Sequence, residues 1–437
     1  MTAQGLSPQF PAYTDHGPQV PVHCVTPQTP GAIHRFYDSS PFSPSGRYLA
    51  VTRLPFEDRL PRPGEPAEIV VVDLASGEAR SVAETRGWDT QLGAQVQWGN
   101  DDRTLLFNDV DTRHWRAHGV RLDPLGGARS QLDGTVYAVS PDGSCSAGPC
   151  LLRTSRTQRG YGVVVPPEHV PENRGVPADD GIYLTDLSSG ASRLLVSIAE
   201  VFETAFPAAI RDQYRGGDFY CFHVKWNPQG TRLLLVLRWL PRTWLPWRRK
   251  KQYRRLHAVT LDADGRNARL AVTDAMWRKG GNHPNWCPDG EHVLMNLNSQ
   301  GTGIRFVRLA FDGSGCETLA PSIRASGHPT LHPDGRHVLT DAYPHEPVAY
   351  GDGTTPLRWI DVTESRETTL VRIRTRSDYE AATPALRVDP HPAWDRGYRR
   401  IAFNACPDGR RKVFVADLAT LVEGTAGGAA AGSRSHA

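Results

Sequence analysis

The protein has 437 residues, of which 39% are hydrophobic and 22% are charged, and its formal net charge is only +3. This composition is typical of a folded, soluble protein, and a charge so close to zero gives no sign of nucleic acid or a membrane surface as a partner. The sequence contains no apolar run near the roughly 18 residues that span a bilayer. Its 41 glycines and 35 prolines are expected where many turns join short strands.

The N-terminal arm, residues 1–18, is polar and lacks the basic and apolar regions of a signal peptide. The seven cysteines are odd in number and scattered, which argues against a disulfide framework. Cys145 and Cys150 are close in sequence, but no second pair of cysteines completes a zinc ribbon. We therefore expect a cytoplasmic protein with free thiols.

One pattern recurs seven times along the chain: a strand, a tight turn that often reads Pro-Asp-Gly, and a second strand. In this turn Pro presets φ, Asp tolerates the next position, and Gly adopts the positive φ that reverses the chain. The copies occupy residues 39–51, 95–107, 137–143, 223–230, 281–296, 327–335 and 389–395.

Each copy is followed, after a variable gap, by an apolar or β-branched run that ends in aspartate. The seven runs end at Asp73, Asp123, Asp186, Asp262, Asp312, Asp361 and Asp417. A short turn and an alternating fourth strand, such as residues 79–83, usually follow. Four short antiparallel strands per repeat, at intervals of about 45 residues plus insertions, are the pattern of a β-propeller blade. The sequence therefore predicts an all-β, seven-bladed β-propeller over residues 19–421.

The two ends of the chain differ in character. The seventh unit ends at Asp417 with little chain left for an outermost strand, whereas residues 19–25 have strand character. We expect this N-terminal strand to complete the seventh blade, which closes the ring and removes an exposed edge. The tail, residues 422–437, is rich in Gly, Ala and Ser and is predicted to be disordered.

Three insertions interrupt the repeat, at about residues 151–180, 200–220 and 239–256. The second is expected to contain a short helix. Because propeller loops at one rim commonly form the binding face, all three are candidate lids. The third is rich in Arg and Trp, which suits either a grip on an anionic sugar chain or a solvated basic loop with tryptophans packed on the rim. The rest of the chain has no basic bias that would favour nucleic acid or a membrane.

Four histidines occupy equivalent positions immediately before the innermost strand of consecutive units: His223, His283, His328 and His391. Equivalent positions in a ring face the same mouth of the channel, so these imidazoles are expected to cluster. Asp389 lies two residues before His391, and alternation along an extended segment would place both side chains on one side. Two histidines and an aspartate at one point suit a divalent metal such as Mn²⁺, Ca²⁺ or Zn²⁺.

Other polar residues near the mouth have more ordinary explanations. Any single histidine before a strand can be a hydrogen-bonded packing residue, although four at matched positions make this explanation weaker. His34 and Arg35 lie slightly upstream of the corresponding place in the first unit. Asp89 and Gln91 precede the innermost strand of the second repeat. Residues in such a position more often form hydrogen bonds within their own loop.

The run from Asp389 to Trp394, Asp-Pro-His-Pro-Ala-Trp, followed by residues 412–418, resembles oligogalacturonate lyase and its relatives. These proteins are seven-bladed propellers that cleave short uronic-acid chains by β-elimination with a bound manganese. The resemblance extends over residues 34–418. It places His283 at the position of the catalytic base and His328 at that of a metal ligand.

The closing metal motif of that family is Gln-x-x-His-Pro-His, and the corresponding window here is residues 386–391. His391 is kept, Asp389 replaces a histidine, and Leu386 stands where the family has glutamine. The chain is therefore expected to be a divergent relative. The resemblance implies a carbon–oxygen lyase with a divalent metal, manganese before calcium or zinc, held by His328, Asp389 and His391.

The implied chemistry agrees with these residue types. β-Elimination removes the weakly acidic C5 proton next to a uronate carboxylate, and a metal or an arginine on that carboxylate stabilises the developing charge. A neutral histidine, with an ordinary pKa of about 6.5, can accept the proton near pH 7. His283 is the predicted base. The candidates for binding the carboxylates of an anionic oligosaccharide are His34, Arg35, His223 and Arg387.

Two other kinds of propeller share these turns. A non-catalytic binding or scaffold propeller of the Tol type has the same turns but needs no histidine cluster. The propeller of a prolyl-oligopeptidase-type enzyme would be followed by a hydrolase domain with Gly-x-Ser-x-Gly, which this sequence lacks. The sequence does not determine the oligomeric state.

Overall fold

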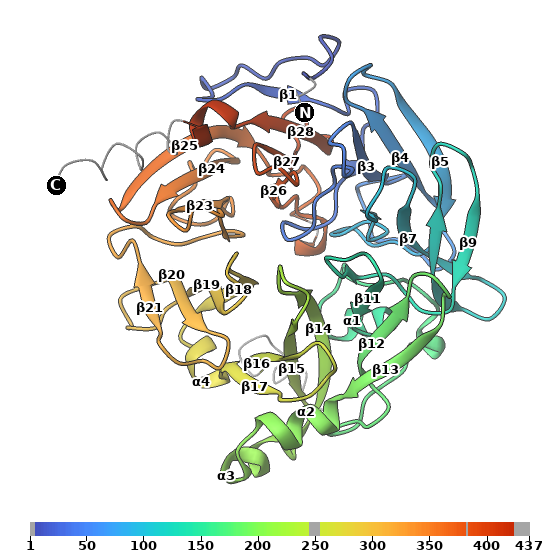
Figure 1. Ribbon diagram of the computed structural model, residues 1–437, viewed down its shortest axis with the longest axis vertical. Helices are drawn as coiled ribbons and strands as arrows, with labels where there is room; N and C mark the ends of the chain where they lie inside the picture. Colours follow the sequence, from blue (N-terminus) through green and yellow to red (C-terminus); the bar gives the residue numbers. More distant parts are fainter. Residues whose placement is uncertain (1–4, 244–253, 382, 424–437) are drawn as a thin grey trace, which may run out of the picture.

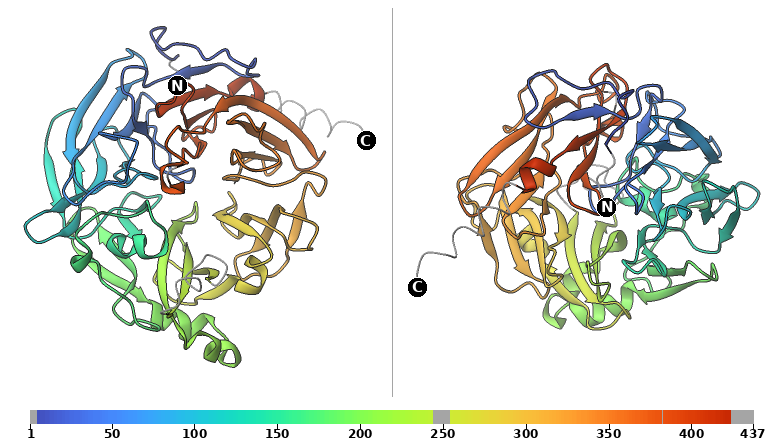
Figure 2. Two further views of the ribbon diagram at one scale, coloured as in Figure 1. Left: turned by 180° about the vertical axis from the view of Figure 1, so that it is seen from behind. Right: turned by 45° about the horizontal axis from the view of Figure 1, so that its top comes forward.

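The structure is a computed structural model, and it describes residues 5–243, 254–381 and 383–423. The strands of these residues form seven four-stranded antiparallel sheets, which follow one another around a ring (Figures 1 and 2). The predicted seven-bladed β-propeller is confirmed.

Within each blade the four strands follow one another from the channel outward. The first three blades are β2 (Ala32–Ile33), β3 (Tyr48–Arg53), β4 (Ala67–Asp73) and β5 (Ala79–Thr85); β6 (Gln97–Trp98), β7 (Leu105–Asp111), β8 (Arg116–Leu122) and β9 (Arg129–Leu132); and β10 (Ala138–Val139), β11 (Cys145–Gly148), β12 (Gly181–Asp186) and β13 (Ser192–Ser197).

The next three blades are β14 (Gly217–Trp226), β15 (Arg232–Pro241), β16 (Arg255–Asp262) and β17 (Arg269–Val272); β18 (Gly281–Trp286), β19 (His292–Leu297), β20 (Arg305–Ala310) and β21 (Glu317–Leu319); and β22 (Thr330–Leu331), β23 (His337–Thr340), β24 (Thr354–Asp361) and β25 (Arg366–Arg374). The seventh contains β26 (Ala393–Trp394), β27 (Arg400–Ala405), β28 (Lys412–Asp417) and β1 (Val22–Cys24).

The turn residues explain the repeat. Gly143, Gly290 and Gly335, each the last residue of a Pro-Asp-Gly turn between the two innermost strands, have φ of +69°, +68° and +70°. The aspartate that ends the third strand also has a local role. Asp73, for example, accepts hydrogen bonds from the backbone N–H groups of Ala75 and Ser76, at 3.0 and 3.3 Å, and so closes the next turn.

The hydrophobic core lies between neighbouring blades, because alternate residues of a strand face opposite sides of its sheet. On β15, Leu233, Leu235 and Leu237 belong to a cluster shared with the third blade, whereas Leu234 and Val236 pack with residues of the fifth. Four tryptophans on innermost strands also donate their indole N–H to the preceding blade. These bonds join Trp98 to Pro41, Trp226 to Ala138, Trp286 to Lys225 and Trp394 to Thr330.

The N-terminal strand closes the ring. In the seventh sheet β1 pairs antiparallel with β28, with Val22 opposite Ala416 and Cys24 opposite Phe414. The prediction that residues 19–25 complete the last blade is confirmed. In Figure 1 β1 and β28 accordingly lie side by side.

The insertions contain most of the helices. Residues 151–180 include α1 (Leu151–Thr157) and η1 (Pro167–His169), and the second insertion includes α2 (Ile198–Ala205), α3 (Ala208–Arg211) and η2 (Asp212–Tyr214). The described chain also contains α4 (Asp274–Trp277) and η5 (Pro384–Leu386). The short helix expected near residues 200–220 is therefore present. None of the helices in this part of the chain is long and apolar enough to cross a membrane.

The third insertion begins later than predicted. β15 continues to Pro241 and β16 begins at Arg255, because the two strands extend their pairing as far as Trp239 opposite Arg255. Residues 244–253 of this Arg/Trp segment lie outside the described residues, as do residues 424–437 of the predicted disordered tail.

Candidate functional site

The four histidines gather at one end of the central channel. The ring centroids of His283 and His328 are 4.0 Å apart, and those of His328 and His391 are 4.4 Å apart. The ring of Phe36 lies among them, with its centroid 4.7 Å from His391, 5.0 Å from His223, 5.7 Å from His328 and 6.4 Å from His283. Residues far apart in sequence therefore meet, as the repeat predicts.

Their relation to the strands differs from the prediction. His328 and His391 precede β22 and β26, but His223 and His283 lie inside β14 and β18. Both of these strands shift register at the histidine, between residues 221 and 224 and between residues 282 and 285. An irregularity of this kind re-aims a side chain while the strand continues to pair. The expectation that all four histidines precede their strands is therefore wrong for two of them.

His283 has a defined protonation pattern. Its Nδ1 lies 2.6 Å from the carbonyl oxygen of Gly327, which can only accept a hydrogen bond, so Nδ1 carries the proton and Nε2 keeps its lone pair. Burial of the ring, with a contribution from His328, holds the pKa of His283 well below its usual range. The backbone has φ of +55°, in the left-handed region that few non-glycine residues adopt, histidine more readily than most.

His328 is fixed by an aspartate that sequence reasoning missed. Its Nδ1 lies 2.9 and 3.0 Å from the two carboxylate oxygens of Asp341, and its backbone N–H donates to the same carboxylate at 2.6 Å. The backbone N–H of His391 donates to Asp341 as well, at 3.3 Å. Asp341 therefore joins two blades and leaves Nε2 of His328 available to another ligand.

His328, Asp389 and His391 could hold a metal ion. One potential ligand atom from each lies within 4.8 Å of those of the other two, and all three side chains are buried. Both ring nitrogens of His391 lack a hydrogen-bond partner, an unusual state for a buried imidazole. Burial, with a contribution from His328, also holds the pKa of His391 well below its usual range, so the imidazole is neutral. Two imidazoles and a carboxylate are donors that fit Mn²⁺ or Zn²⁺.

Asp389 and His391 meet for a reason other than the expected one. Nε2 of His391 is 3.8 Å from the Asp389 carboxylate, but φ of His391 is +49°, so the segment between them is not extended. Nε of Arg387 donates to both oxygens of the same carboxylate, at 2.8 and 3.1 Å. Each carboxylate oxygen has a second lone pair, so this ion pair is compatible with a metal.

A partly exposed layer lies next to these buried residues and comprises His223, His283, Tyr343 and Arg387. The Tyr343 hydroxyl is 3.3 Å from Nε2 of His283 and 3.4 Å from Nε2 of His328. Burial raises the pKa of Tyr343 well above its usual value, which keeps the phenol protonated.

The first insertion contributes to the site through Tyr161. Its ring lies 6.3 Å from that of His223, and its hydroxyl accepts a hydrogen bond from Arg387 at 2.9 Å. His223 itself is paired with Tyr137 and stacks on Phe36. The insertion over residues 151–180, a candidate lid from the sequence, thus reaches the histidine cluster.

His34 and Arg35 lie outside the partly exposed layer. His34 is 1% exposed, and burial lowers its pKa to about 3. The guanidinium of Arg35 donates to Gln95 at 2.8 Å and covers the ring of Tyr137. Asp89 accepts three backbone hydrogen bonds, two of them from its own loop, so it has the structural role that was expected of it.

Asp341, Tyr343, Phe36 and Tyr161 were not found by sequence reasoning. Phe36 follows His34 and Arg35 directly, so its aromatic character beside the predicted mouth was an available signal. Asp341 and Tyr343 lie in the loop between β23 and β24, and no motif distinguishes them.

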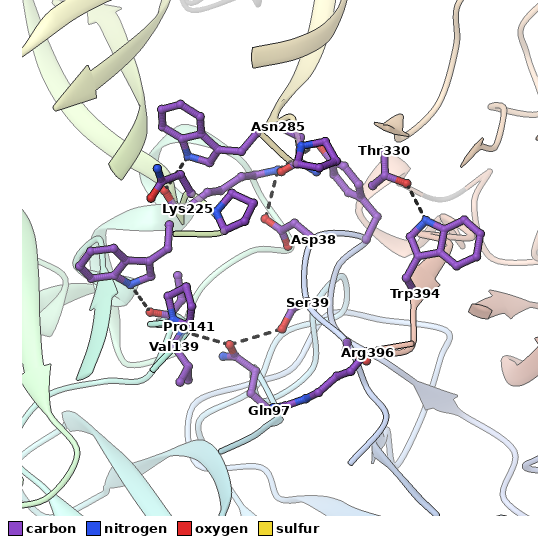
Figure 3. Close-up of a pocket in the computed structure, with 18 of the residues that line it drawn as sticks. Asp38, Ser39, Gln97, Val139, Pro141, Lys225, Asn285, Thr330, Trp394 and Arg396 are labelled. Atoms are coloured by element: carbon purple, nitrogen blue, oxygen red, sulfur yellow. Dashed lines mark hydrogen bonds and ion pairs between the residues drawn. The ribbon is translucent and has the colours of Figure 1, made fainter. Parts of the chain in front are cut away.

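A cavity of about 420 Å³ lies away from the four histidines, and Figure 3 shows residues that line it. It is lined by the last residues of the innermost strands and by the turns after them, and none of the four histidines contributes to it. Lys225 and Asp38 form an ion pair in it at 3.1 Å, and Figure 3 shows their side chains pointing toward each other. The cavity borders the candidate site through Tyr37, which lines it and whose ring lies 5.2 Å from that of His328.

Comparison with solved structures supports the fold. An oligogalacturonate lyase in complex with manganese matches with a TM-score of 0.64 at 15% identity, covering 95% of this chain and 96% of that chain. An oligogalacturonate lyase from Vibrio parahaemolyticus matches with a TM-score of 0.60 at 13% identity, covering 94% and 97%. A putative TolB from Agrobacterium tumefaciens has a TM-score of only 0.39 at 16% identity, covering 78% of this chain and 94% of that chain.

No family model and no curated protein matches the sequence. The resemblance to oligogalacturonate lyases extends to the fold, at 15% and 13% sequence identity. The chain is a seven-bladed β-propeller of the same architecture as these lyases over nearly its whole length.

Proposed function

We propose that the protein is a divalent-metal-dependent lyase that cleaves uronic-acid-containing oligosaccharides by β-elimination, with His283 as the base. The observation that carries the proposal is the arrangement of His283, whose Nδ1–H is held by the Gly327 carbonyl. Its Nε2 is thereby left as an acceptor beside a group of two histidines and an aspartate, with the Tyr343 hydroxyl 3.3 Å away.

The proposed metal ligands are His328, Asp389 and His391. Manganese is the first candidate because it is bound in one similar lyase, and zinc and calcium are alternatives. Calcium prefers a shell of oxygen atoms, so two imidazoles make it the weakest of the three. When bound, the metal would neutralise the substrate carboxylate beside C5 and stabilise the charge that develops there.

The protein's own groups supply the proton chemistry. A neutral His283, kept so by burial, is ready to accept the C5 proton at neutral pH. Arg387 and His223 are the proposed contacts for substrate carboxylates, because both are partly exposed beside the base. Arg387 also balances the charge of Asp389, from which it is separated by 2.8 Å.

The direct test is incubation of the purified protein and Mn²⁺ with a panel of uronate oligosaccharides. Elimination creates a C4–C5 double bond, so the expected result is a rise in ultraviolet absorbance, and His283→Ala should abolish it. Absence of product from every uronate, with metal supplied, would favour a non-catalytic binding ring instead.

A further inference from the structure

The hydroxyl of Tyr343 lies beside the proposed base on the same side of the site. It is 3.3 Å from Nε2 of His283, the atom assigned to proton abstraction, and 3.4 Å from Nε2 of His328. Tyr343 is only partly exposed, and its ring stacks on His345 at 5.6 Å, which restricts its motion. The elimination proposed above assigns no role to this phenol.

Such proximity has a stereochemical consequence. β-Elimination removes the proton on C5 and the oxygen on C4. In a 4-linked uronate of gluco or manno configuration the C4 oxygen is equatorial, so it leaves from the same side of the ring as the axial C5 proton. In a galacturonate the C4 oxygen is axial and lies on the opposite face from that proton. An acid that touches the base can therefore reach the leaving oxygen only in the first case.

We propose that Tyr343 is the acid that protonates the leaving C4 oxygen, and that the preferred substrate is a uronate whose C4 oxygen is equatorial, of the glucuronate type. This inference rests on the proposed lyase function and specifies its substrate class. The predicted preference differs from galacturonate, the substrate after which the similar solved lyases are named.

The step balances within the protein and its substrate. Nε2 of His283 takes the C5 proton, and the electrons of the C5–H bond form the C4–C5 double bond. The electrons of the C4–O bond leave with the oxygen, which takes the phenolic proton of Tyr343. The phenolate then recovers a proton from Nε2 of His283, which is adjacent. Both residues return to their starting states without a further reactant.

The test compares two substrates of equal length, oligoglucuronate and oligogalacturonate, with the Mn²⁺-loaded protein. The expected result is faster formation of unsaturated product from oligoglucuronate. Tyr343→Phe should lower that rate by about 10²- to 10⁴-fold, the usual contribution of a positioned acid or base. The matched control is Tyr350→Phe, which removes the hydroxyl of an exposed tyrosine in the same loop, 42% exposed, and should leave the rate unchanged.

Two measurements that do not depend on activity accompany this comparison. Elemental analysis should find the same Mn²⁺ content in Tyr343→Phe as in the wild type. Calorimetry should find that the two proteins bind oligoglucuronate with affinities that differ by no more than a few-fold. Loss of manganese from Tyr343→Phe would overturn the proposal, because Tyr343 would then be a metal ligand.

The remaining outcomes separate this inference from the lyase proposal. Faster cleavage of oligogalacturonate than of oligoglucuronate would overturn the inference but would still support the lyase function. Cleavage of oligoglucuronate at an undiminished rate by Tyr343→Phe would overturn the acid role. If the protein cleaves neither of these substrates nor any other uronate, both proposals are overturned.

Discussion

Nδ1 of His283, in the fifth blade, lies 2.6 Å from the carbonyl oxygen of Gly327, which leads into the sixth. The proton of the proposed base is therefore placed by a neighbouring blade. Gly327 has φ of +68°, and a Cβ atom there would lie 2.1 Å from the Asp341 carboxylate, so only glycine fits. The same short segment thus orients His283 and leaves room for the aspartate that holds His328.

His283→Asn tests the base directly. Asparagine tolerates the positive φ of this position, so the fold should be retained while the proton acceptor is lost. The rate of unsaturated product formation should fall by about 10²- to 10⁴-fold, with metal content and the thermal unfolding midpoint close to those of the wild type. Retention of most of the activity would show that another group takes the proton.

Asp341→Asn tests the support of the metal ligands. The aspartate accepts from Nδ1 and the backbone N–H of His328 and from the backbone of His391, and an amide cannot replace all of these contacts. Mn²⁺ affinity, measured by calorimetry on metal-free protein, should fall by about 10- to 100-fold.

Asp334→Asn is the matched control for this substitution. Asp334 contacts Nδ1 of His337 at 2.6 Å in the turn between β22 and β23, at the opposite end of that blade from the candidate site. The Asp334→Asn substitution should leave the Mn²⁺ affinity unchanged. An equal loss of affinity in the two variants would mean that Asp341 acts only through stability.

His257 should make the protein less stable in acid. It is 1% exposed, its Nδ1 accepts the backbone N–H of Asp274 at 3.2 Å, and burial lowers its pKa to about 3. The unfolded chain, with a histidine pKa of about 6.5, binds a proton below that pH, whereas the folded chain does not until about pH 3. The free energy of unfolding should therefore decrease as pH falls through this window, by about 2 kcal/mol from this group between pH 7 and pH 5.

Denaturant unfolding at several pH values measures this effect. His257→Gln cannot gain a charge, so the decrease between pH 7 and pH 5 should be smaller in the variant by about the same 2 kcal/mol, whatever its stability at pH 7. An identical pH dependence in the two proteins would contradict the assignment.

Val22→Asp tests the closure of the ring. Val22 is 2% exposed and packs with the core of the sixth and seventh blades, so a carboxylate there would be buried without a partner. The thermal midpoint should fall clearly, and the open edge of β28 should promote aggregation, visible by size-exclusion chromatography. His23→Asp, the next residue in β1 and partly exposed, should have a much smaller effect. Equal behaviour of the two variants would show that β1 does not secure the ring.

Much of the fold was predictable because each of its determinants is local. A Pro-Asp-Gly turn such as the one ending at Gly290, together with alternation of apolar residues, sets one strand pair without reference to the rest of the chain. Repetition of this unit then sets the number of blades. The later start of the third insertion was not predictable, because the length of β15 depends on its pairing with β16.

The candidate site was predictable only in part. Matched positions of His283, His328 and His391 in successive repeats indicated that they share a mouth, since equivalent positions in a ring converge. Asp341 and Tyr343 come from a loop without a motif, and their importance depends on contacts with histidines of other segments.

By itself, then, the sequence determined the repeat, the closure by β1 and the set of imidazoles, because turn chemistry and strand periodicity are encoded within a few residues. Only the tertiary structure decided which nitrogen of His283 carries its proton, which aspartate holds His328, and which hydroxyl lies beside the base. Those features arise where two blades or two loops meet, and their distances depend on the packing of the whole ring.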